Sequence, residues 1–145
     1  MHRPRGVTVI AVVNAFAAVL TIAFWGLVLA RLFAPGAVVP AGMDAGSVST
    51  VYGFMVGDFV WAVLTLVVSA AGLWRMKAWG WVAAQMVNIL WIYSLTVIWC
   101  RDLHLGAISP GAVLFSPFVL FSVWAVFHLW SVRGEFDFRA GRAAT

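Results

Sequence analysis

The sequence has few charged residues and a single cysteine. Charged residues make up 10% of the 145 residues, against about 25% in a typical soluble domain, and hydrophobic residues make up 64%. A water-soluble fold of this size could not cover so much apolar surface, so the composition indicates a protein that lies in a lipid bilayer. The lone Cys100 excludes an intrachain disulfide, a CxxC redox pair and a multi-cysteine metal site.

Motifs that supply chemistry are also missing. The chain has no HExxH motif, no Ser-His-Asp set, no phosphate-binding loop and no acidic cluster for a metal. The sequence therefore predicts no enzyme and no resident metal or cofactor. A net charge of +4 could indicate nucleic acid, but the basic residues lie at the ends of apolar runs, which favours the bilayer and its anionic headgroups as the partner.

Four apolar stretches are long enough to cross a membrane, which requires about 20 helical residues. They cover about 7–33, 51–73, 79–99 and 111–132. The length suits one bundle, so we predict an all-α integral membrane four-helix bundle over residues 1–145, with a polar tail over 133–145. The first stretch exceeds the apolar core of a signal peptide, about 7–15 residues, and is predicted to be a retained span.

Seven of the nine basic residues lie on one side of the predicted bundle. They precede the first span, lie between the second and third, or follow the fourth: Arg3, Arg5, Arg75, Lys77, Arg133, Arg139 and Arg142. Only Arg31 and Arg101 lie on the other side. The positive-inside rule therefore predicts that both termini are cytoplasmic, in the cell inner membrane.

The connection between the second and third spans reads GLWRMKAWGW. Its cations, Arg75 and Lys77, resist translocation, while Trp74, Trp79 and Trp81 offer amphipathic rings to the headgroup zone. These five residues are predicted to anchor the topology. So short a turn also requires the second and third spans to be antiparallel neighbours.

Two polar positions mark the predicted starts of helices. Ser47 or Ser49 is the expected N-cap of the second span, because a serine hydroxyl can accept a free backbone N–H of the first turn. Ser109 followed by Pro110 predicts the start of the fourth span, with proline at the first helical position.

Asp58 is the outstanding polar residue inside a predicted span. It lies seven residues into the second span, about 10 Å deep at 1.5 Å per residue. A charged carboxylate there needs a cation or a hydrogen-bond donor. Arg31, near the outer end of the first span, is at a compatible height, so an Arg31–Asp58 pair is the preferred structural interpretation. A proton- or ion-coupling site and an isolated acid in a water-filled vestibule are the alternatives.

Amide side chains form a second polar group. Gln85 and Asn88 share one face of the third span and must face protein, because amides exposed to lipid would stay unsatisfied. Asn14 in the first span lies about as deep as Gln85, so a hydrogen bond between these amides is expected. The preferred interpretation is adhesion between helices, and the alternative is a polar track for a substrate.

Small residues recur at a spacing of four. Gly53 and Gly57 form one step in the second span, and Gly26 and Ala30 form another in the first. Such steps let helix backbones approach closely. The contacts they serve could lie within one chain or between chains.

Two histidines raise the question of haem ligation. His104 follows the third span and His128 lies near the far end of the fourth, so the two are on opposite sides and cannot hold one haem. A single axial ligand is the alternative to an interfacial histidine that makes hydrogen bonds, which is the preferred interpretation.

Two segments carry a resemblance to a known group of proteins. RPRGVTVIAVVNA near the start and GLWRMKAWGWVAA in the hairpin together make up about a fifth of the chain. They resemble small uncharacterised four-helix membrane proteins of bacteria and archaea, which have an RPxGV-type N-terminus and a GLWxxKxWxW-like hairpin. The resemblance implies a four-span inner-membrane fold and brings no activity or functional residues with it.

Three functions follow as hypotheses. The first is a non-catalytic accessory or scaffold subunit, or a self-associating bundle, present as a homo-oligomer or within a larger membrane complex. The second is a small oligomeric transporter or channel that uses Asp58, with Gln85 and Asn88. The third is a cofactor-binding membrane subunit that uses His128 or His104.

Overall fold

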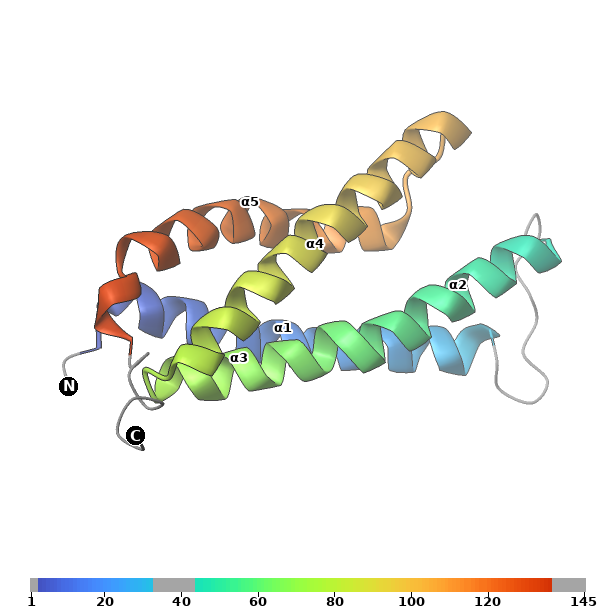
Figure 1. The fold of residues 1–145 in the computed structure, drawn as a ribbon. Coiled ribbons are helices and arrows are strands. Elements are labelled where there is room, and N and C mark those ends of the chain that lie inside the picture. The colour runs from blue at the N-terminus through green and yellow to red at the C-terminus, as the bar shows by residue number, and fades with distance from the viewer. Residues whose placement is uncertain (1–2, 33–43, 137–145) are drawn as a thin grey trace, which may run out of the picture.

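The computed structural model describes residues 3–32 and 44–136, and these residues form helices without a strand (Figure 1). The helices are α1 (Arg5–Leu32), α2 (Ala45–Gly57), the π-helix η1 (Asp58–Val63), α3 (Leu64–Trp74), α4 (Ala78–Leu105), α5 (Pro110–Ser131) and the 3-10 helix η2 (Arg133–Glu135). α2, η1 and α3 follow each other without a break. Four segments are thus long and apolar enough to cross a membrane, and the predicted all-α four-helix fold is confirmed. The predicted tail beyond residue 136, with Arg139 and Arg142, lies outside the described residues.

The second segment starts at Ala45 and not at residue 51. Its N-cap is Asp44, whose Oδ1 accepts the backbone N–H of Ser47 at 2.7 Å. The predicted caps, Ser47 and Ser49, lie inside the helix, so that prediction was wrong. The reason is that the first turns of α2 are polar and extend the helix beyond its apolar run.

The third segment is also longer than predicted, because α4 continues to Leu105 instead of ending at residue 99. The residue that caps its C-terminal end is Gly106, whose φ of 66° is a left-handed conformation that glycine adopts at little cost. The predicted start of α5 is confirmed. Ser109 caps the helix through its side chain and Pro110 occupies the first turn.

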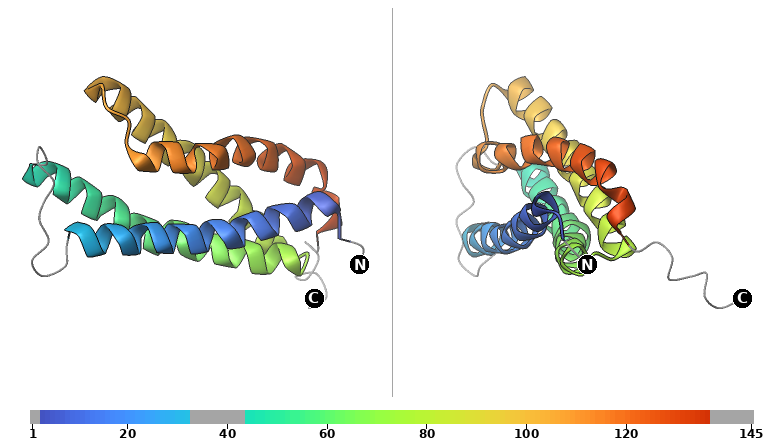
Figure 2. Two further views of the ribbon diagram at one scale, coloured as in Figure 1. Left: turned by 180° about the vertical axis from the view of Figure 1, so that it is seen from behind. Right: turned by 90° about the vertical axis from the view of Figure 1, so that its left-hand side faces the viewer.

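The bundle is closed at one end and spread at the other (Figures 1 and 2). We call the end with the start of α1, the turn at residues 75–77 and the end of α5 the hairpin end. The opposite end, with the start of α2 and the turn at 106–109, is the loop end. α3 packs against α1 and α4, and α4 packs against α5. Towards the loop end, α4 moves away from α2.

Two glycines bring α3 and α4 into backbone contact at the hairpin end. A Cβ atom built on Gly72 would overlap the backbone of Gly80, and one built on Gly80 would overlap Gly72. Helices can approach this closely only where neither residue has a side chain. The prediction that these two spans are antiparallel neighbours is confirmed, and α3 with α4 is the most extensive helix pairing in the described chain.

The turn between α3 and α4 places a methionine where glycine is usual. Met76 has a φ of 53°, and its N–H donates to the carbonyl of Leu73 at 3.1 Å. The N–H of Lys77 donates to the carbonyl of Gly72 at 2.9 Å, which completes a Schellman motif. The Met76 side chain is 5% exposed, so its burial offsets the cost of the left-handed conformation.

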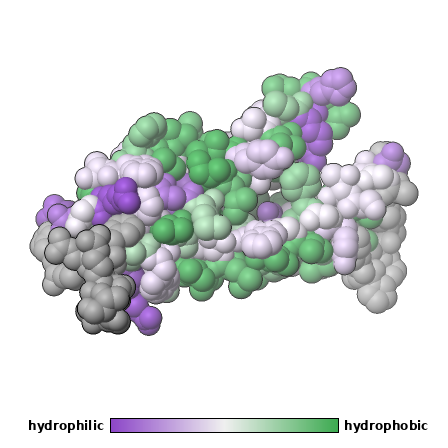
Figure 3. Space-filling model, in the orientation of Figure 1, coloured by the Kyte–Doolittle hydropathy of each residue, from purple (hydrophilic) through white to green (hydrophobic). Residues whose placement is uncertain are grey.

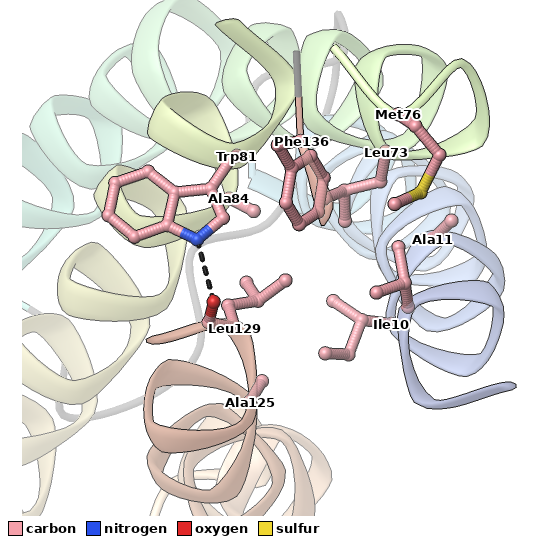
Figure 4. Close-up of a cluster of buried hydrophobic side chains, with 10 residues drawn as sticks. Ile10, Ala11, Leu73, Met76, Trp81, Ala84, Ala125, Leu129 and Phe136 are labelled. Atoms are coloured by element: carbon pink, nitrogen blue, oxygen red, sulfur yellow. Dashed lines mark hydrogen bonds between the residues drawn. The ribbon is translucent and has the colours of Figure 1, made fainter. Parts of the chain in front are cut away.

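The main hydrophobic cluster fills the hairpin end (Figure 4). Its buried members are Val7, Ile10, Ala11, Leu73, Met76, Trp81, Ala84, Ala125, Leu129 and Phe136. Trp81 is 7% exposed, and its Nε1–H donates to the carbonyl of Leu129 at 2.8 Å. The prediction that Trp81 anchors in the headgroup zone is therefore corrected, because this ring packs in the core. Trp74 and Trp79 are half-exposed.

Replacing Gly72 with alanine is expected to open the hairpin, because the new methyl group meets backbone that cannot move aside. We expect a loss of about 1–3 kcal/mol of unfolding free energy, measured by denaturant titration in mixed micelles. Gly53→Ala is the matched control, since nothing lies within 4 Å of its added methyl group. Equal stability of the two variants would contradict the close contact.

The start of α2 is expected to loosen in acid. Hydrogen bonds from the Ser47 side chain and backbone N–H hold the pKa of the Asp44 carboxyl below its ordinary 3.8. The cap therefore contributes fully above that ordinary value and is lost as the pH falls through the lowered pKa. Hydrogen exchange of the backbone amides of residues 46–48 should accelerate as the pH falls through the lowered pKa of Asp44. The Asp44→Asn variant should show no such step, because the asparagine side chain does not titrate and caps the helix equally at both pH values.

Candidate functional site around Asp58

Asp58 lies deep in the apolar part of the second segment. It is sixteen residues from Trp74, about 24 Å along the helix, and thirteen from Ala45, about 20 Å. A hydrocarbon core is about 30 Å thick. The predicted depth of about 10 Å is counted from the apolar run that begins at residue 51, and the helix continues outward from that run to Ala45.

The carboxylate is held by a tryptophan of α1. Trp25 Nε1–H donates to Asp58 Oδ2 at 2.8 Å, and Trp25 is 6% exposed. Among the described residues Asp58 forms no ion pair with Arg31, so the preferred Arg31–Asp58 pair is not found. Arg31 is six residues beyond Trp25, about 9 Å further along the axis of α1 and on another face of the helix.

Trp25 is fixed in turn by a series of aromatic contacts. Its ring meets Phe24 edge-on at 5.1 Å between centroids, and Phe24 meets Phe115 of α5 at 5.2 Å. Phe115 then contacts Trp91 of α4 at 5.1 Å. These contacts connect three helices and hold the indole N–H in position for Asp58. Sequence analysis missed them, because ring-to-ring contacts depend on how the helices are rotated.

Asp58 is also the first residue of the π-helix η1. A π-helical segment has one extra residue per turn, is rare, and frequently marks a functional site. Here it follows directly on Gly57 and ends with the buried Val63. Nothing in the apolar pattern of the second span indicated such a segment.

The intramembrane amides face protein as predicted, but with other partners. Asn14 is buried and its Nδ2 donates to Ser69 Oγ of α3 at 2.8 Å. Gln85 Nε2 donates to the carbonyl of Val126 in α5 at 3.3 Å. The expected bond between Asn14 and Gln85 is therefore wrong. α3 lies beside both α1 and α4, so the amide of Asn14 finds its partner on α3.

Asn88 is 1% exposed, and its Nδ2 has no hydrogen-bond partner in the described part of the chain. It lies next to Val87, which belongs to the second hydrophobic cluster with Ala17, Ala18 and Leu66. An unpaired buried donor costs about 1–3 kcal/mol. Asn88 is therefore a buried polar residue whose Nδ2 finds no acceptor among residues 3–32 and 44–136.

The two histidines lie at opposite ends of the bundle, as predicted. His128 stacks on Trp124 at 5.0 Å between ring centroids, and its buried Nε2 lies against the backbone of α1 at Gly6. That contact leaves no space for a haem iron at Nε2. His104 is exposed on the last turn of α4. No group of three or more His, Cys, Asp or Glu side chains gathers within residues 3–32 and 44–136.

The sequence did not predict that a second acidic residue, Asp102, is buried. Asp102 is 2% exposed, and its Oδ1 accepts from Arg101 Nη2 at 2.7 Å. Its Oδ2 accepts the backbone N–H of Ser109 at 2.7 Å. The carboxylate thus fixes the turn between α4 and α5. It was missed because residues 100–105 were assigned to a loop.

No protein-family model, curated protein or solved structure gives a significant match to the chain. Its class is therefore defined by the fold and the site alone. It is an all-helical, four-segment bundle of membrane-spanning length that holds a carboxylate deep in its apolar region.

Replacing Trp25 with phenylalanine should destabilise the protein by about 1–3 kcal/mol, because the buried carboxylate loses its donor. The loss should shrink in an Asp58→Asn background, where the charge is absent, in a double-mutant cycle of unfolding free energies. Trp79→Phe is the matched control, since that ring is 45% exposed. Equal losses in Trp25→Phe and Trp79→Phe would refute a role for this hydrogen bond.

Proposed function

We propose that this protein is a non-catalytic, multi-pass component of the cell inner membrane that assembles with itself or with a larger membrane complex. The observation that carries the proposal is the state of Asp58. Its carboxylate belongs to a helix long and apolar enough to cross a membrane, is partly exposed, and accepts one hydrogen bond in the described chain, from Trp25. A carboxylate in this setting favours a further donor or cation, which a partner protein can supply.

The shape of the bundle supports association. Towards the loop end α4 parts from α2, so the faces of these helices are not covered by each other (Figures 1 and 2). Within residues 3–32 and 44–136, no neighbouring atom lies within 4 Å of a Cβ added at Gly26, Gly53 or Gly57, so the predicted small-residue steps make no close contact there. They remain available for the close approach of a second helix.

The distribution of charge supports a cytoplasmic location of both termini. The described cations at the hairpin end are Arg3, Arg5, Arg75, Lys77 and Arg133. The start of α1 and the end of α5 lie at this same end (Figure 1). With the positive-inside rule, the hairpin end faces the cytoplasm and the loop end faces outward.

The resemblance to small four-helix membrane proteins is part of the proposal. Its two segments meet in the main hydrophobic cluster, where Val7, Ile10 and Ala11 pack with Leu73 and Met76. The residues that carry the resemblance therefore have a shared structural task. They close the hairpin end of the bundle.

A small oligomeric transporter or channel is the second candidate. Asp58 opens a π-helical segment, and the buried Nδ2 of Asn88 has no hydrogen-bond partner among the described residues. Proton- or ion-driven flux into liposomes that is lost in Asp58→Asn would favour transport. Tight liposomes with an intact heavier assembly would favour the accessory role.

The deciding measurement is the native mass after extraction in the mildest effective detergent. We expect an assembly heavier than the 15.8 kDa chain. Asp58→Asn should weaken the association by about fivefold to thirtyfold, the range for a polar contact of about 1–2 kcal/mol between helices. Asp44→Asn is the matched carboxylate-to-amide control. A solitary monomer in both wild type and Asp58→Asn would overturn the proposal.

A further inference from the structure

The hairpin end concentrates positive charge in a way that the loop end does not. Five of its described side chains are cations, and Glu135 is the acid described there. At the loop end, Arg101 is paired with Asp102, and Asp44 caps α2. In Figure 3 the hydrophobic residues cover the middle of the molecule, while hydrophilic residues gather at its ends.

Two of these cations are held against aromatic rings. The Arg3 guanidinium lies over the Trp74 ring at 3.9 Å and donates to the Trp74 carbonyl at 3.0 Å. Arg133 lies over Trp130 at 5.3 Å and over Trp81 at 5.5 Å. These ring contacts hold the two positive charges at the level where the helices begin and end.

The turn presents two further cations outward. Its central residue, Met76, is buried in the core, whereas the flanking Arg75 and Lys77 are exposed. Half-exposed rings of Trp74 and Trp79 accompany them. Amphipathic rings beside cations are the features that match the phosphate and glycerol region of a lipid.

An apolar track leads away from this cationic turn along α4. Its members are exposed and follow the three- and four-residue spacing of one helix face: Trp79, Val82, Met86, Ile89 and Tyr93. A lipid with its headgroup at the turn would lay its acyl chains along this track. The same surface therefore offers contacts to both parts of a phospholipid.

We propose that the turn between α3 and α4 is a binding site for an anionic phospholipid. The phosphate lies between Arg75 and Lys77, Trp79 lies beside the glycerol region, and the acyl chains follow the exposed face of α4. Charge complementarity selects an anionic headgroup over a zwitterionic one. The site does not depend on Asp58 or on the proposed assembly.

The test is lipid retention by the full-length protein in native mass spectrometry. Micelles contain either phosphatidylglycerol or phosphatidylcholine with the same acyl chains. Wild type should retain phosphatidylglycerol preferentially, and each of Arg75→Gln and Lys77→Gln should reduce this preference by about fivefold. Arg31→Gln, which removes an exposed cation near the loop end, is the matched control and should retain the preference.

Charge-conserving variants separate binding from folding. Arg75→Lys and Lys77→Arg should keep the preference, and the melting temperature of all variants checks that the hairpin is intact. Equal retention of both lipids by wild type, or an unchanged preference in Arg75→Gln and Lys77→Gln, would overturn the proposal. Displacement of the lipid by millimolar inorganic phosphate would also overturn it, because the site would then recognise a free anion. None of these outcomes depends on how many protein chains the assembly contains, so the proposed assembly is tested separately.

Discussion

The arrangement of the bundle depends on the contact between the backbones of Gly72 and Gly80. Because neither residue has a side chain, α3 and α4 meet at their shared end, and the turn between them is closed by the buried Met76. α4 then runs obliquely away from α2, and the loop end opens (Figure 2). The compact hairpin end and the spread loop end are thus two results of one close contact.

Three polar side chains in the apolar region each form a hydrogen bond with a residue of another helix. Asn14 binds Ser69, Gln85 binds a carbonyl of α5, and Asp58 binds Trp25. Two of these bonds join α1 to the second segment and one joins α4 to α5, and together they fix the rotation of these helices about their axes. Asn88 keeps an unpaired Nδ2 in the described chain, and Asp58 keeps partial exposure. These two groups distinguish the site from an ordinary packed interior.

The two proposals involve opposite ends of the bundle. Cations and tryptophans at the hairpin end suit the surface of a membrane, and the core there is closed by the start of α1 and the turn between α3 and α4. Towards the loop end lie uncovered helix faces and Gly26, Gly53 and Gly57, at which an added Cβ would meet no atom of the described residues within 4 Å. Association through the loop end and lipid contact at the hairpin end can therefore coexist in one molecule.

The sequence alone determined the number of helices, their order, the antiparallel pairing at the hairpin and the cap at Ser109, because apolar run length and local capping are properties of consecutive residues. It also identified Asp58, Asn14, Gln85 and Asn88 as polar residues inside the spans, but not the buried Asp102. The tertiary structure decided their partners: Trp25 in place of Arg31 for Asp58, Ser69 in place of Gln85 for Asn14, and a core position for Trp81. The physical reason is that a partner depends on helix rotation and crossing, which are set by contacts such as Gly72 with Gly80 between residues on different helices.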